Sequence, residues 1–271
     1  MGLATRVALS LGVMAGSSTS VQAQGTEPRQ GPSWTLRGLR SEQCIRFLVQ
    51  PDVASRSRRE GLQPIRADQD SSLHPALRRV ISDQPEFASW TPSAICLFYA
   101  DTVALAGRTI VEKNARRPQL IVVWTLATTE QGSGARRDLV LELGTSDPRV
   151  VRAAEAVKLR IRSAESAVTT PPDSDEVHVV KLGKTRLAWT GRAAGDSTRV
   201  EQPLEESWKL KGASGVVWNV RRILHSEWNR SLVGVLRVEG KDDLSKALKS
   251  SPIRFIGPRY LGGRAEFLFS R

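Results

Sequence analysis

The chain has 271 residues, and its 40 lysines and arginines against 28 aspartates and glutamates give a formal net charge of +12 at pH 7. This length is ample for a hydrophobic core and suits one large domain or two small ones. After the first 23 residues no stretch is long and apolar enough to cross a bilayer, because a span needs roughly 20 apolar residues. The charge favours anionic partners; the alternative is an arginine-rich composition that only keeps the protein soluble.

The N-terminus has the three parts of a secretory signal peptide. Arg6 supplies the positive charge, residues 7–16 form a mostly apolar run, and residues 21–23 end in Ala23 as the expected cleavage site. The polar residues 17–20 end the apolar run too early for a membrane anchor. We therefore expect residues 1–23 to be removed and the mature protein to be exported to the periplasm or the medium.

Two cysteines, Cys44 and Cys96, each lie in a strand-like run. An even pair in an oxidising compartment predicts a disulfide, and two buried free thiols are the alternative. The bridge would close a loop of about 53 residues and contribute roughly 4 kcal/mol in the chain-entropy model. A structural zinc site needs four Cys or His ligands at close spacing, so we expect no metal and no cofactor.

The first half of the chain alternates strands and helices. Residues 24–33 are polar and rich in Pro and Gly, which predicts a flexible leader, and residues 52–70 read as irregular. Apolar spacing predicts a helix from Ser71 or Ser72 to Ile81. Asp147 or Ser146 is expected to cap a second helix that begins at Pro148. The predicted strands cover residues 44–49, 95–99, 102–111, 120–127 and 139–143.

Residues 169–176 have the composition of a linker and separate an N-terminal lobe, 34–168, from a C-terminal lobe, 177–271. The second lobe contains a predicted hairpin around Gly183 and a helix over residues 242–249. Its other predicted strands cover residues 206–210, 216–224, 232–238, 253–256 and 265–269. The fold class that follows is α+β: strand-rich, with antiparallel or mixed sheets and helices packed on one face.

The two lobes have similar patterns. Val122-Val123-Trp124 is followed by an apolar strand, an Asp-bearing turn and a helix, and Val216-Val217-Trp218 is followed by the same series. A duplication would predict two related lobes with a groove between them, which is a common place for a ligand. Chance similarity is the alternative.

Few residues suggest chemistry. No HExxH motif occurs, which argues against a metallohydrolase. His225 and Glu227 would share a face of an extended chain and are weak candidates for acid–base catalysis, together with His178. The favoured interpretation of residues 225–231 is a solvated turn between two strands.

Three tryptophans and three arginines near the C-terminus each have a structural and a functional interpretation. Trp189, Trp208 and Trp218 fall on predicted strands, where core packing is favoured over stacking on sugars or lipids. Near the C-terminus, arginines alternate with Gly, Pro and aromatic residues. A closing hairpin with solvent-facing arginines is favoured there; if the chain has a site, Arg254, Arg259 and Arg264 are its predicted anion ligands.

From the sequence we therefore predict an exported, non-enzymatic binding protein. Its expected partner is an anionic envelope polymer, lipid head groups or another protein, and nucleic acid is not expected. A hydrolase acting on the envelope and an assembly factor of the envelope that pairs strand edges are the two alternatives.

Overall fold

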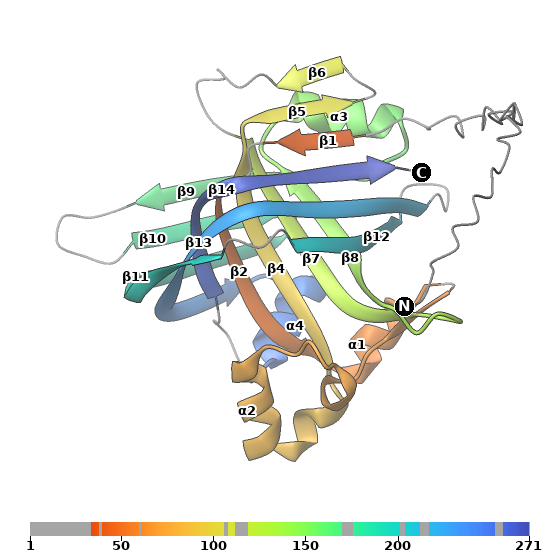
Figure 1. Cartoon of the computed structure of the whole chain (residues 1–271), viewed down its shortest axis with the longest axis vertical. Helices are drawn as coiled ribbons and strands as arrows, with labels where there is room; N and C mark the ends of the chain where they lie inside the picture. The colour runs from red at the N-terminus through yellow and green to blue at the C-terminus, as the bar shows by residue number, and fades with distance from the viewer. Residues whose placement is uncertain are drawn as a thin grey trace, which may run out of the picture.

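The computed structural model describes residues 34–37, 40–59, 61–105, 108–111, 119–169, 176–200, 204–211, 217–252 and 257–270. The predicted signal peptide, the leader and most of the predicted linker lie outside these ranges. Within them the chain is strand-rich, with one mixed sheet of 14 strands and a few short helices (Figure 1). None of the helices in this part of the chain has the length and hydropathy that crossing a membrane requires.

The helices are α1 (Pro51–Arg56), α2 (Pro75–Asp83), α3 (Pro148–Ala156) and α4 (Asp243–Ser250), with short 3-10 turns at Ala67–Gln69 and Pro85–Ser89. The strands of the first half are β1 (Trp34–Arg37), β2 (Arg40–Val49), β3 (Leu62–Pro64), β4 (Thr91–Ala100), β5 (Thr102–Leu105), β6 (Arg108–Val111), β7 (Gln119–Glu130) and β8 (Arg136–Thr145). The strands of the second half are β9 (Arg162–Thr169), β10 (Glu176–Leu182), β11 (Thr185–Val200), β12 (Leu204–Lys211), β13 (Val217–Glu239) and β14 (Gly257–Ser270).

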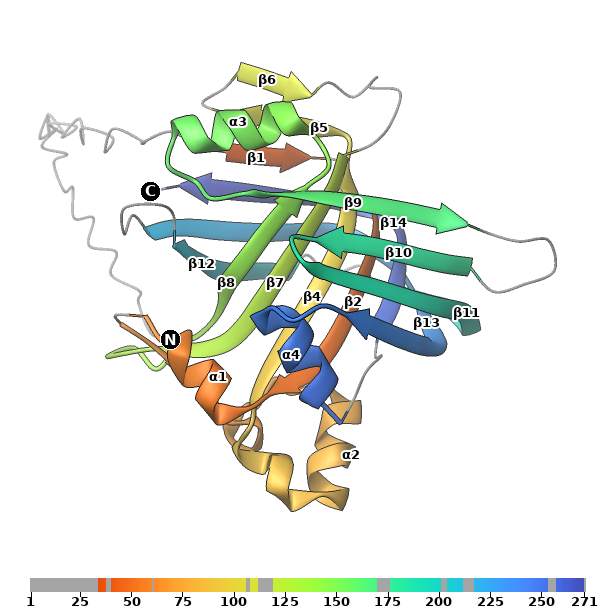
Figure 2. The same cartoon turned by 180° about the vertical axis from the view of Figure 1, so that it is seen from behind.

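The sheet closes on itself because strands from the two halves pair. β12 runs parallel to β8, and the long strand β13 pairs with β12, β11 and β14. One closed ring is therefore β12-β13-β14-β2-β4-β7-β8, and a second runs through β9, β10 and β11 instead of β12. Figures 1 and 2 show the four strands β2, β4, β7 and β8 as the wall that both rings share.

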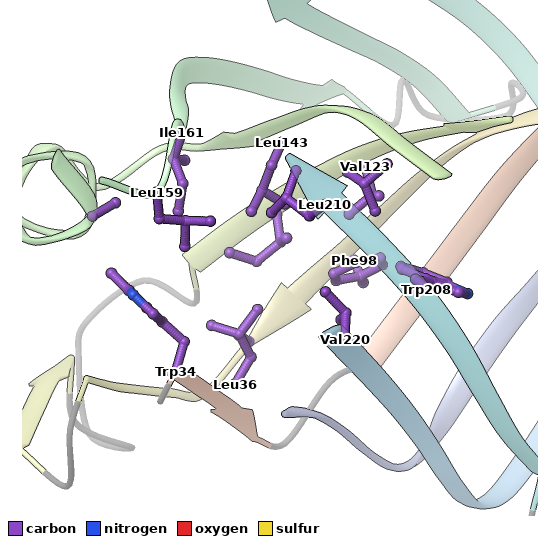
Figure 3. Packing of buried hydrophobic residues seen from close by; sticks show 14 of the residues in the cluster. Trp34, Leu36, Phe98, Val123, Leu143, Leu159, Ile161, Trp208, Leu210 and Val220 are labelled. Atoms are coloured by element: carbon purple, nitrogen blue, oxygen red, sulfur yellow. The ribbon is translucent and has the colours of Figure 1, made fainter. Parts of the chain in front are cut away.

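Both faces of this shared wall are buried, because successive side chains of a strand point to opposite faces. Cys44 and Phe98 belong to the first cluster, which fills the ring containing β12 (Figure 3). Ile45 and Ile95 are the chain neighbours of the opposed pair Cys44 and Cys96, and they belong to a second cluster on the other face. Helix α4 contributes three residues to this second cluster: Leu244, Ala247 and Leu248. A near-continuous apolar run such as that of β7 is what burial on both faces requires.

The tryptophans of the predicted strands are core residues. Trp208 and Trp218 lie in the first cluster and Trp189 in the second, and each is at most 5% exposed. The core interpretation of these three side chains is therefore confirmed.

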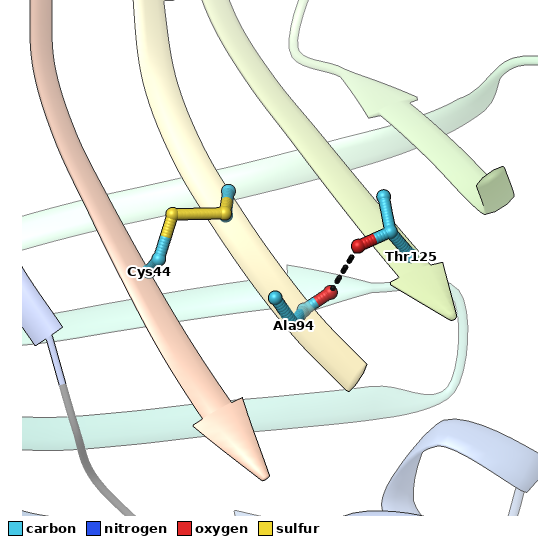
Figure 4. Close-up of a disulfide and its surroundings, with 4 residues drawn as sticks. Cys44, Ala94 and Thr125 are labelled. Atoms are coloured by element: carbon cyan, nitrogen blue, oxygen red, sulfur yellow. Dashed lines mark hydrogen bonds between the residues drawn. A yellow bond between two sulfur atoms is a disulfide. The ribbon is translucent and has the colours of Figure 1, made fainter. Parts of the chain in front are cut away.

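The predicted disulfide is confirmed. Cys44 on β2 lies directly opposite Cys96 on β4, and their Cα atoms are 4.1 Å apart. Figure 4 shows the bridge beside Thr125 of β7, whose hydroxyl donates a hydrogen bond to the backbone carbonyl of Ala94 (3.5 Å). The bridge therefore ties two strands of the shared wall.

Some sequence-based elements are wrong in detail. Residues 225–231 are not a turn but the middle of β13, because β14 and β11 pair with the strand on either side. Helix α2 begins at Pro75, with His74 as its N-cap in place of Ser71 or Ser72. Residues 216–224 and 232–238, expected as two strands, form one continuous strand within the described range that starts at Val217.

Other elements are as expected. Asp147 caps α3, and its carboxylate accepts hydrogen bonds from the backbone N–H (2.7 Å) and the guanidinium of Arg149. Gly183 has a positive φ of 59° in the tight turn that joins β10 to β11. Helix α4 matches the predicted helix over residues 242–249 to within one residue at each end.

We predict that replacing both cysteines, Cys44→Ala with Cys96→Ala, lowers the free energy of unfolding by roughly 4 kcal/mol, because the 52-residue separation sets a long loop. Guanidinium unfolding of the oxidised wild type and the double variant measures the difference. The reduced wild type should lose a similar amount, and an unchanged midpoint in the double variant would contradict the prediction.

We predict that Asp147→Ala costs about 1 kcal/mol at pH 7, because α3 loses its cap. Hydrogen bonds from the Arg149 side chain hold the pKa of Asp147 below its usual range. Its stabilising effect is therefore present above about pH 4 and is lost as the pH falls through the folded-state pKa. Urea unfolding at pH 7 and pH 3 should show a difference that shrinks in acid, whereas Asp83→Ala on the exposed end of α2 should stay within about 0.5 kcal/mol of wild type.

Candidate functional site

A polar pocket lies against the end of the shared wall, on the same face as the disulfide. The wall contributes side chains of β2, β4, β7 and β8, and residues 70–77 before and within α2 close the other side. The hollow is small, with a cavity volume of about 50 Å³, and part of it is open to solvent. Its charged lining residues are Arg46, Asp70, His74, Arg136 and Asp138.

The strand register brings these residues together. Arg46 lies two residues after Cys44 on β2 and opposes Ala94 of β4, which in turn opposes Thr125 of β7. Two residues further along β7, Ala127 opposes Asp138 of β8. Side chains two residues apart share a face, so the disulfide, Arg46 and Asp138 all lie on one side of the wall.

Asp70 is the most deeply buried charge of the pocket, with a side chain that is 1% exposed. Its Oδ1 accepts hydrogen bonds from the backbone N–H of Ser72 (2.9 Å) and from Nε of Arg136 (3.3 Å). Its Oδ2 is buried and has no hydrogen-bond partner in the described part of the chain. A buried carboxylate oxygen without a partner costs free energy, and a bound water, an ion or a catalytic role can account for one.

Arg136 holds two carboxylates together. Its guanidinium contacts Asp70 and also Asp138, with 3.2 Å between Nη1 and Oδ1 of Asp138. Burial lowers the pKa of Arg136, but the carboxylates of Asp138 and Asp70 raise it by more, so that the pKa is raised overall. This guanidinium therefore stays charged.

His74 combines a structural and a chemical feature. Its Nδ1 accepts a hydrogen bond from the backbone N–H of Ala76 (3.2 Å), which caps α2. Burial lowers the pKa of His74, and the positive charge of Arg46 lowers it further. The imidazole is therefore neutral near pH 7, and since Nδ1 is an acceptor, its proton is on Nε2.

Arg46 brings a positive charge that no carboxylate neutralises within the described part of the chain. Its Nε is buried without a hydrogen-bond partner, and no ion pair to Arg46 occurs among the described residues. A guanidinium that lines a pocket and has no ion pair can bind a carboxylate or phosphate.

None of the residues singled out in the sequence lines this pocket. His178 is buried on β10 and stacks on Trp189 of β11, with ring centroids 5.3 Å apart. His225 and Glu227 lie on β13, and Arg259 and Arg264 lie on β14, in stretches whose side chains the structure does not describe. Arg254 lies outside the described residues. Their predicted roles as acid–base groups and anion ligands stay predictions.

The sequence offered only a faint signal for the pocket. Arg46 follows a cysteine on a strand, Asp70 ends a segment read as irregular, and Arg136 begins a strand more than 60 residues later. The one local cue is Leu73-His74-Pro75, where a histidine precedes a proline at the first position of a helix.

Two further observations on the described residues concern metal binding and lysine side chains. Within this part of the chain no group of three or more His, Cys, Asp or Glu side chains could hold a metal ion. Lys209, the least exposed of the lysines whose exposure is described, is still 24% exposed, and it donates a hydrogen bond to Asn219 (2.6 Å) away from the pocket.

No family model matches the chain, and no curated protein matches its sequence. Similar solved structures exist. An acetoacetate decarboxylase is 11% identical with a TM-score of 0.48, over 90% of this chain and 88% of that one. An acetoacetate decarboxylase-like enzyme from Sphingomonas wittichii RW1 is 9% identical with a TM-score of 0.47, over 88% and 90%. The enduracididine biosynthesis enzyme MppR complexed with pyruvate is 10% identical with a TM-score of 0.48, over 94% and 92%.

These neighbours are enzymes, and they contradict the sequence-based prediction of a non-enzymatic binding protein. That prediction rested on net charge and on the lack of a catalytic motif. Neither shows which side chains lie close together in the folded chain. At such low identity and TM-score the likeness assigns no activity, substrate or residue to this chain.

We predict that His74→Asn removes one source of acid sensitivity. Because the pKa of His74 is lowered in the folded state, the unfolded state takes up the proton at a higher pH than the folded state does. The contribution of neutral His74 to the free energy of unfolding is therefore fully present above about pH 6.5 and is lost as the pH drops toward the folded-state pKa. Asparagine keeps an N-cap acceptor but does not titrate. Urea unfolding between pH 7.5 and pH 5 should therefore be flatter for the variant, and parallel curves would contradict the assignment of neutral His74.

Proposed function

We propose that this chain is an enzyme whose active centre is the polar pocket between α2 and the shared wall. The observation that supports this best is the presence in one pocket of a neutral imidazole N–H, on His74, and a buried carboxylate oxygen without a partner, on Asp70. A histidine with a perturbed pKa in a concave site is typical of catalytic centres.

The two groups would have complementary roles. The carboxylate of Asp70, held in place by Ser72 and Arg136, accepts a proton or a hydrogen bond from the substrate. The Nε2–H group of neutral His74 donates to a substrate oxygen on which negative charge develops. Arg46 attracts an anionic part of the substrate to the same pocket.

This proposal needs no covalent intermediate on a lysine. Schiff-base chemistry requires a desolvated lysine, and no lysine whose exposure the structure describes is buried. Acid–base catalysis by positioned side chains contributes typically 10²–10⁴-fold to a rate, which sets the scale of the effects expected from mutating the pocket.

We also keep export as a proposal. A disulfide between strands is typical of proteins that fold in an oxidising compartment, and the Cys44–Cys96 bridge therefore supports export. Two finer expectations from the sequence, helices on one face and duplicated lobes, likewise stay proposals.

To test the proposal, the purified protein is incubated with a library of small polar metabolites, and consumption of each is followed by mass spectrometry. We expect the wild type to convert at least one compound. Asp70→Asn and His74→Asn should slow that conversion by roughly 100-fold or more, because each removes one acid–base group.

Arg186→Gln is the matched control, since Arg186 forms an exposed ion pair with Glu239 outside the pocket (2.9 Å). Its rate should equal that of the wild type. Thermal unfolding checks that each variant is folded. Conversion that persists in both folded pocket variants would show that the active centre lies elsewhere, and no conversion by the wild type would count against an enzyme.

A further inference from the structure

We infer that this pocket binds one small planar monoanion on Arg46, and that His74 takes up a proton from solvent when the anion binds. The inference rests on the proposed function for the place of the site, and it adds the class of ligand and a link between ligand binding and pH. The carboxylate group of an organic molecule and an inorganic ion such as nitrate both belong to this class.

The terminal nitrogens of Arg46 can reach a ligand. Among the described residues Arg46 forms no hydrogen bond and no ion pair, and its Nε is buried. Nη1 and Nη2 are not among the buried side-chain atoms that lack a partner, so solvent reaches both. The side chain as a whole is half-buried and lines the hollow. A guanidinium in this setting binds a planar oxyanion through parallel N–H donors.

The hollow limits both the size and the charge of the anion. Its cavity volume of about 50 Å³ takes roughly three to five non-hydrogen atoms, because one water-sized ligand needs about 10–15 Å³. Formate and nitrate are of this size. The carboxylates of Asp70 and Asp138 lie 3.3 Å and 3.2 Å from Arg136. A second negative charge on the ligand would face these carboxylates, so a monoanion is favoured over a dianion such as sulfate.

His74 responds to the charge of Arg46. The charged groups around His74 are Arg46 on β2, Asp70 before α2, Arg78 within α2, and Arg136 and Asp138 on β8. β4 and β7 contribute no charged residue to the lining of the pocket. Burial lowers the pKa of His74, and the positive charge of Arg46 lowers it further. Arg46 is therefore the charged neighbour that acts on the imidazole.

An anion on Arg46 offsets much of this positive charge, so His74 accepts a proton more easily while the anion is bound. The link is reciprocal, because a ligand that favours protonation must itself bind more tightly to the protonated form by the same factor. It acts through charge and needs no contact between the anion and the imidazole. A rise of about half a pKa unit corresponds to roughly threefold tighter binding.

The added proton has one place on the imidazole. In the neutral form Nε2 carries the hydrogen, and Nδ1 accepts the hydrogen bond from the backbone N–H of Ala76 (3.2 Å). Protonation therefore occurs at Nδ1, and both ring nitrogens are then donors. The cap bond at the first turn of α2 is lost, so the amide resonance of Ala76 reports the proton uptake independently of the imidazole.

Nuclear magnetic resonance on the full chain tests the inference. The His74 imidazole resonances, assigned by their absence from His74→Asn, are followed from about pH 8 to about pH 4.5 with sodium formate, sodium nitrate or sodium sulfate at equal ionic strength. We expect formate, nitrate or both to give a saturable response, to raise the pKa of His74 by at least about half a unit, and to shift the Ala76 amide. Sulfate should do none of these. A response to formate alone would support a carboxylate ligand, and a response to nitrate alone an inorganic oxyanion.

The variants separate anion binding from the proton link. Arg46→Gln should lose the saturable response, and its His74 should titrate at a higher pH than in the wild type, because the positive charge is gone. His74→Asn should still bind the anion, followed on the backbone amides of β2, without the roughly threefold gain toward acid pH. Arg186→Gln is again the control and should behave as the wild type does. If Arg46→Gln does not fold, the comparison of the three anions on the wild type still decides.

The inference is overturned if neither formate nor nitrate gives a saturable response, if sulfate binds as tightly, or if a folded Arg46→Gln variant responds as the wild type does. An unchanged pKa of His74 at saturation also overturns it. These outcomes differ from failure of the proposed function. Proton-linked anion binding without turnover of any compound would support the site and remove the enzyme. Turnover that His74→Asn abolishes, without an anion response at Arg46, would do the reverse.

Discussion

The rest of the structure depends on the pairing of β2, β4, β7 and β8 into a wall that is buried on both faces. Its alternating side chains supply the first cluster on one side and the second on the other, so a slip of one residue would exchange the two cores. The Cys44–Cys96 bridge joins two of these strands at directly opposed positions. The same register that separates the cores also places Arg46 and Asp138 on one face, at the pocket.

The pocket is polar because it lies where the wall extends past the first cluster and meets α2. Leu48, Ala67, Leu73 and Leu77 form a small separate cluster there, and Leu73 and Leu77 also line the pocket. Asp70 is fixed by Arg136 from a strand, and His74 is fixed by its role as a helix cap. Such positioning by rigid elements on both sides is what a precise binding or catalytic centre needs.

Local patterns in the sequence were reliable where neighbours along the chain decide the outcome. The cap at Asp147, the turn at Gly183, helix α4 and the buried tryptophans are of this kind. The stretch around His225 was misread because its polar residues resemble a turn, whereas pairing with β11 and β14 holds it as strand. Of the candidate site, the sequence predicted none of the lining residues, since Arg46, Asp70 and Arg136 come from segments far apart in the chain.

By itself the sequence determined a strand-rich fold, the disulfide partners and the helices α3 and α4, because periodicity, capping residues and a single pair of cysteines act locally or allow one solution. Only the tertiary structure decided that β12 pairs with β8 and that β13 runs unbroken along the sheet, closing two rings around one wall. The pocket depends instead on the register of β2, β4, β7 and β8 and on the packing of residues 70–77 against them. Its buried, unpaired atoms on Asp70 and Arg46 arise from long-range packing, which no local pattern records.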